Sequence, residues 1–142
     1  MSAEASTPRA AVDSAPRVRN RVIVVVAAVL AAVVVWLIAT VAGAPLTVDQ
    51  GSGPQDVTVL AVIVTSALAA LFGWGLLALL ERVSARATTI WTAIAVAVLV
   101  LSLVPASLVD ATAGTTVALV LMHLAVGAVV ILGYRRAGAR RG

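Results

Sequence analysis

Four uninterrupted apolar runs, each long enough to cross a membrane, constrain this chain more than any other feature. A helix needs roughly 20 apolar residues to cross about 30 Å of hydrocarbon. Of all residues, 62% are hydrophobic and 11% are charged, and a soluble domain of this composition would expose apolar patches that aggregate. The runs comprise residues 22–41, 57–80, 88–109 and 115–133. The chain is therefore predicted to be an integral membrane protein.

Helices are the expected structure of these runs, although valine is abundant in them. An apolar strand in lipid leaves its backbone unpaired, and the runs lack the alternation of a barrel. The connections are short, which is typical of antiparallel neighbours. The predicted fold class is therefore an all-α membrane protein, an antiparallel bundle of four transmembrane helices within residues 22–134. Residues 1–21 are expected to form a disordered basic tail, and residues 135–142 a second basic tail.

The arginines predict the orientation of the bundle. All ten basic residues are arginines, and the connections after the first and third runs hold none of them. The arginines lie before the first run, between the second and third, and after the fourth, at positions 9, 17, 19, 21, 82, 86, 135, 136, 140 and 141. Because basic connections stay in the cytoplasm, both termini are expected to be cytoplasmic. The same arginines favour contact with anionic lipid, and no nucleic acid is expected as a partner.

A cleavable secretory signal is the alternative for the first run. A basic segment, an apolar stretch and the sequence Ala42-Gly43-Ala44 together resemble a signal with its cleavage site. The apolar stretch is longer than the roughly 7–15 residues usual for such signals, which favours a retained helix. Cleavage would leave three spans that still agree with the remaining arginines.

Three sequence blocks carry a resemblance to a known family. They are GWGLLALLER at the end of the second run, IWTAIAVAVLVLSL in the third and LVLMHLAVGAVVI in the fourth. Over about Val22 to Tyr134 the chain resembles a family of small actinobacterial four-span integral membrane proteins catalogued as a domain of unknown function. The resemblance implies the architecture and a location in the bacterial plasma membrane, and it implies no activity.

His123, the only histidine, lies near the middle of the fourth run. Even a neutral imidazole in hydrocarbon needs partners for its N–H and its lone pair. Ser66 and Ser102 lie at a similar depth in their runs, so an intramembrane polar cluster of Ser66, Ser102 and His123 is geometrically reasonable. The cluster could be a proton or ligand site, or an interhelical hydrogen bond that fixes packing. Gly127, one turn from His123, is expected to let a neighbouring helix approach closely.

Charged residues at the inner ends of the runs are interpreted as interfacial anchors: Glu81, Arg82, Arg135 and Arg136. A gating or coupling role for Glu81 and Arg82 is the alternative. Enzymatic activity is not expected, because a Ser/His/Asp triad would need a buried acid that the runs lack. A single histidine and no cysteine are too few ligands for haem or a metal ion, so no cofactor and no metal site are expected.

The function expected from these observations is structural or accessory: a small membrane protein that binds lipid, another membrane protein or a second copy of itself. The alternative is a small transporter or channel subunit that uses the His123 face. A transport pathway needs polar residues at several depths, whereas the polar residues of these runs occupy essentially one layer. This single layer favours the accessory role.

Overall fold

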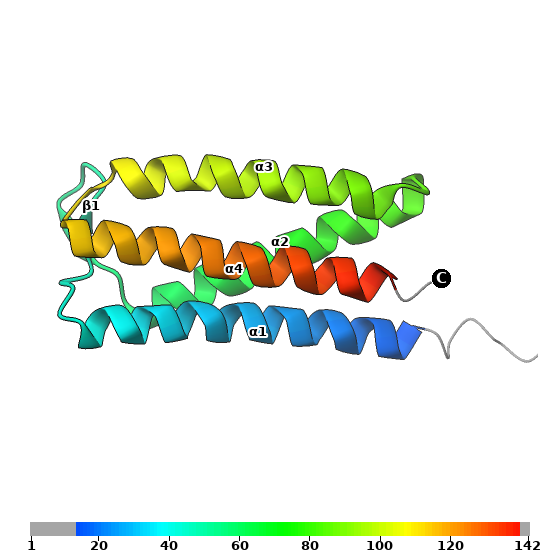
Figure 1. Ribbon diagram of the computed structural model, residues 1–142, viewed down its shortest axis with the longest axis horizontal. Helices are drawn as coiled ribbons and strands as arrows, with labels where there is room; N and C mark the ends of the chain where they lie inside the picture. The colour runs from blue at the N-terminus through cyan, green and yellow to red at the C-terminus, as the bar shows by residue number, and fades with distance from the viewer. Residues whose placement is uncertain (1–13, 140–142) are drawn as a thin grey trace, which may run out of the picture.

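The computed structural model describes residues 14–139 and, within them, four long helices joined by short connections (Figure 1). The helices are α1 (Ser14–Val41), α2 (Val59–Val83), α3 (Ala87–Leu108) and α4 (Ala113–Ala139). Each contains a segment long and apolar enough to cross a membrane. Large apolar side chains such as Phe72 and Leu101 are exposed on the outside, where lipid would cover them. The predicted four-span helical bundle is therefore confirmed.

Two helices extend beyond the predicted runs. α1 begins at Ser14 rather than Val22, so residues 14–21 are helical and do not belong to a disordered tail. α4 continues to Ala139, through the first residues of the expected basic tail. The physical reason is that a helix satisfies its own backbone in water as well as in lipid, and alanine and arginine are good helix formers. The rest of both expected tails lies outside the described residues.

The helices alternate in direction, which gives the bundle two chemically different ends (Figure 1). The basic end holds the start of α1, the α2–α3 connection and the end of α4. The hairpin end holds the strands β1 (Thr47–Asp49), β2 (Pro54–Asp56) and β3 (Asp110–Ala111), paired antiparallel in the order β2-β1-β3. Among the described residues, the arginines therefore lie at the basic end, and all acidic residues except Glu81 lie at the hairpin end.

Local sequence explains where the helices begin and end at the hairpin end. Gly43 follows α1 with a φ of +81°, a left-handed conformation that glycine adopts without strain. The Thr58 hydroxyl accepts a hydrogen bond from the Ala61 N–H and caps α2. The Thr112 hydroxyl accepts from the N–H of Thr115 at the start of α4. These local contacts set the ends of the helices at the hairpin end.

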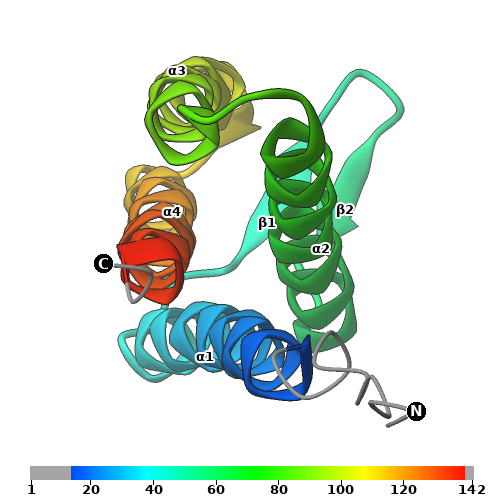
Figure 2. The same cartoon turned by 90° about the vertical axis from the view of Figure 1, so that its right-hand side faces the viewer.

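α2 runs obliquely across the bundle, whereas α1, α3 and α4 lie nearly parallel to its long axis (Figures 1 and 2). α4 lies between α1 and α3 and packs against both. Near its start α2 lies beside α1, where Val62 joins a buried cluster with Ala32 and Met122. Near its end α2 approaches α3, where Leu77 joins a second cluster with Trp91. α2 and α3 therefore diverge toward the hairpin end.

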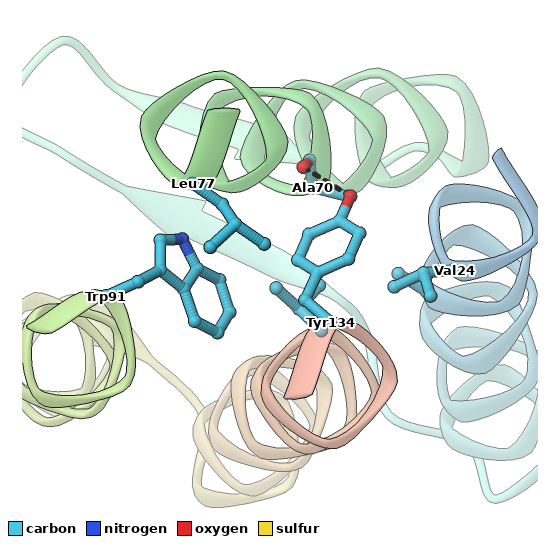
Figure 3. Packing of buried hydrophobic residues seen from close by; sticks show 7 residues of the cluster. Val24, Ala70, Leu77, Trp91 and Tyr134 are labelled. Atoms are coloured by element: carbon cyan, nitrogen blue, oxygen red, sulfur yellow. Dashed lines mark hydrogen bonds between the residues drawn. The ribbon is translucent and has the colours of Figure 1, made fainter. Parts of the chain in front are cut away.

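The basic half of the bundle is tightly packed around two aromatic side chains (Figure 3). Tyr134 is fully buried and donates its hydroxyl to the Ala70 carbonyl at 2.8 Å. The Trp91 indole donates to the Gly73 carbonyl at 2.8 Å, and the two rings meet edge to face with centroids 5.5 Å apart. These contacts join α3 and α4 to α2. Both hydrogen bonds cross between helices, where lipid offers the donors no alternative acceptor.

Glycines on α4 allow its close contact with both neighbours. A Cβ added at Gly127 would lie 2.6 Å from Leu99 Cδ2 on α3, and one added at Gly133 would lie 2.6 Å from Val24 Cγ2 on α1. Distances this short leave no room for a methyl group in the present packing. The predicted close approach at Gly127 is confirmed, and the neighbouring helix is α3.

Candidate functional site: a cavity inside the membrane-spanning bundle

A cavity of about 870 Å³ occupies the space where α2 and α3 diverge. Its volume lies within the range typical of ligand pockets in proteins. α2, α3 and α4 supply most of the wall, and the strands supply residues at the hairpin end. The wall is dominated by alanine, valine, leucine and isoleucine side chains, with a small number of polar groups. Such a wall suits an apolar molecule.

The cavity is open toward the lipid between α2 and α3. Phe72 on α2 and Val98 on α3 both line it, yet their side chains are 75% and 58% exposed. Residues of α3 between Ala95 and Ala106 belong to neither buried cluster in the described part of the bundle. A molecule could therefore enter from the bilayer without first crossing water.

Toward the basic end the cavity is closed by the aromatic packing described above. Trp91, Gly73 and Val130 line this end of the cavity, and Trp91 is 1% exposed. Directly beyond them Tyr134 and Leu77 fill the space between the helices (Figure 3). At the opposite end Val48, Gln55 and Asp56 of the strands border the cavity. The cavity is thus closed toward the basic end and bordered by polar groups at the hairpin end.

The structure brings the three predicted polar residues to this one cavity. Ser66 from α2, Ser102 from α3 and His123 from α4 all line it. Along their helices they lie about 10, 9 and 15 Å from the hairpin end. Ser66 and Ser102 therefore lie at nearly the same distance from the hairpin end, and His123 lies about 5 Å farther along its helix. The wall also includes Thr65, which the sequence places beside Ser66.

The hydrogen bonds of these residues differ from the expected cluster. The Ser66 hydroxyl lies 2.6 Å from the Val62 carbonyl, and the Ser102 hydroxyl lies 2.7 Å from the Leu99 carbonyl. His123 Nδ1 lies 2.8 Å from the Leu119 carbonyl. As far as the described side chains go, the three residues share a cavity and not a hydrogen bond. The reason is that a serine or histidine on a helix can reach the free lone pair of a carbonyl one turn earlier without moving the helices together.

The ring nitrogen of His123 that faces Leu119 must be the donor, because a carbonyl oxygen only accepts. In a neutral imidazole the other nitrogen, Nε2, then carries a lone pair. No described residue donates to Nε2. His123 therefore contributes an acceptor to the wall of the cavity.

An ion pair between Arg21 and Glu81 was not expected from the sequence. One guanidinium nitrogen of Arg21 lies 2.7 Å from both carboxylate oxygens of Glu81, and the two side chains are 7% and 13% exposed. The pair joins α1 to α2 at the basic end. A signal was available, because Arg21 directly precedes the first apolar run and Glu81 directly follows the second. Antiparallel neighbours place these two positions at the same depth.

The predicted interfacial anchors now separate into two groups. Arg82, Arg135 and Arg136 are exposed at the basic end, where their side chains can reach lipid headgroups. Glu81 instead forms the ion pair with Arg21 and is mostly buried. Its role as an interfacial anchor stays a prediction, and the structure adds a charge-assisted contact with Arg21 on α1.

A family model described as a family of unknown function (DUF6069) matches residues 12–140, nearly the whole chain. The chain belongs to this family. No curated protein and no solved structure matches the chain. The family and the four membrane-type helices agree with the resemblance seen in the sequence, and they indicate no specific activity. The cavity is therefore the feature on which a functional proposal depends.

Proposed function

We propose that this chain is a non-catalytic accessory membrane protein that binds a lipid molecule in the cavity between α2, α3 and α4. The observation that carries the proposal is the 870 Å³ apolar cavity with exposed lining residues such as Phe72 and Val98. In a bilayer this opening faces hydrocarbon chains at very high concentration. A hydrocarbon chain of a lipid that enters the cavity fills empty space and gains van der Waals contacts with the wall, which favours binding.

The size of the cavity suits a small lipid-like ligand. At about 870 Å³ it lies within the range of pockets that hold small molecules. The lining includes Met122, which is 6% exposed, so the cavity reaches residues that the outer face of the bundle does not present. A partner protein or a second copy would instead contact the outer faces of the bundle.

A transporter or channel subunit is the less supported alternative. Passage through the bundle would require the packing of Trp91, Leu77 and Tyr134 to open, and these side chains are at most 1% exposed. Ser66, Ser102 and His123, which line the membrane-embedded part of the cavity, lie within about 6 Å of one another along the helices and on the hairpin side of that packing. Both features favour binding over passage.

The proposed location is a bacterial plasma membrane with the basic end in the cytoplasm. The exposed residues Arg82, Arg135 and Arg136 lie at that end, and Asp49, Asp56 and Asp110 lie at the other. This charge distribution follows the positive-inside rule. The arginines would also attract anionic headgroups of the cytoplasmic leaflet, with about 1 kcal/mol for each residue near the surface.

Photolabelling in vesicles tests the proposed lipid site. The protein is reconstituted with a phospholipid whose acyl chain carries a diazirine, irradiated, and the labelled residues are mapped by mass spectrometry. Label is expected on cavity residues that outward lipid does not reach, such as Met122, which is 6% exposed. Ala69→Trp, which adds bulk at the wall, should remove most of that label.

A matched variant separates filling of the cavity from a general effect of tryptophan. Ala97 is exposed on α3 and does not line the cavity, so Ala97→Trp should leave the label on Met122 unchanged. Label confined to outward residues in the wild-type protein would overturn the proposal. Equal loss of label in Ala69→Trp and Ala97→Trp would overturn it as well.

A further inference from the structure

The hydroxyl groups that line the cavity all donate their hydrogen within their own helix. The hydroxyls of Ser66 and Ser102 donate to Val62 and Leu99 of their own helices. Thr65, the third hydroxyl of the wall, also donates within its helix, to the Ala61 carbonyl at 2.7 Å. Because each hydroxyl has a single hydrogen, only oxygen lone pairs remain for a molecule in the cavity.

The imidazole of His123 has the same property. Its Nδ1–H is directed to the Leu119 carbonyl at 2.8 Å, so the neutral ring keeps a lone pair on Nε2. The indole of Trp91, also in the wall, donates to the Gly73 carbonyl. Thr65, Ser66, Ser102 and His123 therefore form an acceptor-only layer about 6 Å thick, in which the described side chains keep no unused donor.

From this acceptor-only layer we infer that the lipid bound in the cavity carries a hydroxyl group that donates to Nε2 of His123: the ligand is a neutral, lipid-soluble alcohol. The inference rests on the proposed lipid site and adds the chemistry of the ligand's polar group. A hydroxyl supplies the one donor that the layer lacks, and its apolar chain fills the rest of the 870 Å³.

Other donor groups fit this layer less well. An ammonium ion would be buried in hydrocarbon, and the described carboxylates of Asp56 and Glu81 lie outside the layer, at opposite ends of the bundle. An amide would bring a carbonyl acceptor that no unused donor of the layer meets. A phospholipid headgroup belongs at the interface, whereas His123 lies about 15 Å along α4 from the hairpin end. A single hydroxyl costs least at this depth.

Competition against the photolabel tests the inference with two matched ligands. A long-chain primary alcohol and its methyl ether have nearly the same chain, but only the alcohol can donate a hydrogen bond. In vesicles of the wild-type protein, the alcohol is expected to displace the label from Met122 at about five- to tenfold lower concentration than the ether, the difference that one buried hydrogen bond makes.

Substitutions at the polar residues of the cavity test which side chain causes the preference for the alcohol over the ether. In His123→Phe the alcohol and the ether should compete equally, while the ether should compete as it does with the wild-type protein, which shows that the variant folds and keeps the chain site. Ser102→Ala should reduce the preference less than His123→Phe. Ser107→Ala is the matched control, because the Ser107 hydroxyl also bonds within α3, to Leu103, but Ser107 does not line the cavity.

The outcomes separate this inference from the proposed function. Equal competition by alcohol and ether with the wild-type protein would overturn the inference and leave the lipid site intact. A preference for the alcohol that persists in His123→Phe would also overturn it. Absence of label on Met122 before any competitor is added would overturn the proposed function, and the inference with it.

Discussion

One guanidinium nitrogen of Arg21 lies 2.7 Å from each carboxylate oxygen of Glu81, a residue 60 positions later in the chain. The pair holds the start of α1 to the end of α2 at the basic end, where α2 has already tilted toward α3. The Arg21 Nε is buried and has no acceptor among the described residues. The guanidinium therefore depends on Glu81 for its charge compensation within this contact.

Breaking this ion pair on one side should destabilise the protein strongly. Arg21→Leu or Glu81→Leu alone removes one partner of this mostly buried ion pair, and the expected loss is about 3 kcal/mol of unfolding free energy. The double variant Arg21→Leu with Glu81→Leu should recover most of that loss. Unfolding of the purified protein in mixed detergent measures all three. Arg82→Leu, at an exposed neighbour, should stay within about 0.5 kcal/mol of the wild-type protein. A double variant as unstable as the sum of the single variants would contradict the coupling.

The hydroxyl of Tyr134 should contribute separately from its ring. Tyr134→Phe removes the hydrogen bond to the Ala70 carbonyl and should cost about 1 kcal/mol. Tyr134→Ala also empties the space beside Trp91 and Leu77 and should cost about 3–5 kcal/mol. The same unfolding measurement compares the two. A phenylalanine variant as stable as the wild-type protein would mean that the interhelical bond contributes nothing.

Three glycine-to-alanine substitutions should affect the stability of the protein to different extents, with the loss decreasing in the order Gly133, Gly127 and Gly75. At Gly133 the new methyl would meet Val24, whose branched side chain has little rotamer freedom, and the loss should be about 1–3 kcal/mol. At Gly127 it would meet Leu99, which lines the cavity and can turn into it, so the loss should be smaller. Gly75 has no neighbour within 4 Å, and Gly75→Ala should be neutral or stabilising by up to about 1 kcal/mol. Unfolding midpoints in any other order would contradict this account of the helix contacts.

The proposed orientation is tested by reporters of membrane sidedness. Fusions after Gly142 and insertions at residues 84–86 should report the cytoplasm, and insertions at residues 50–53 should report the outside. The physical reason is the separation of arginines and aspartates between the two ends of the bundle. An external carboxyl terminus would exclude this orientation.

The first span should be retained in the mature protein. α1 contributes Val24, Ala28 and Ala32 to the buried clusters and Arg21 to the ion pair, so its removal would expose α4 and leave Glu81 without Arg21. Intact-mass measurement of the protein purified from membranes decides the question. A mass that lacks the segment ending near Ala44 would establish the cleaved signal instead.

The sequence by itself determined the class of fold, because the information is local. Whether a run of residues can cross a membrane as a helix depends on its own length and hydropathy, since every backbone hydrogen bond lies within the run. The same is true of Gly127, where the missing side chain alone permits a close helix contact. Counting residues along each helix also places Ser66, Ser102 and His123 away from the helix ends, where all three line one cavity.

Only the tertiary structure decided which faces of the helices meet. Alanine, valine and leucine have the same chemistry whether they face lipid, a neighbouring helix or a cavity, so the sequence pattern does not distinguish these surroundings. The tilt of α2, and hence the cavity beside α3, arises from the sum of many such contacts. For the same reason the sequence placed the serines and His123 together but left their hydrogen-bond partners undecided: each can bond its own helix or a neighbour, and the distance between the helices selects the first.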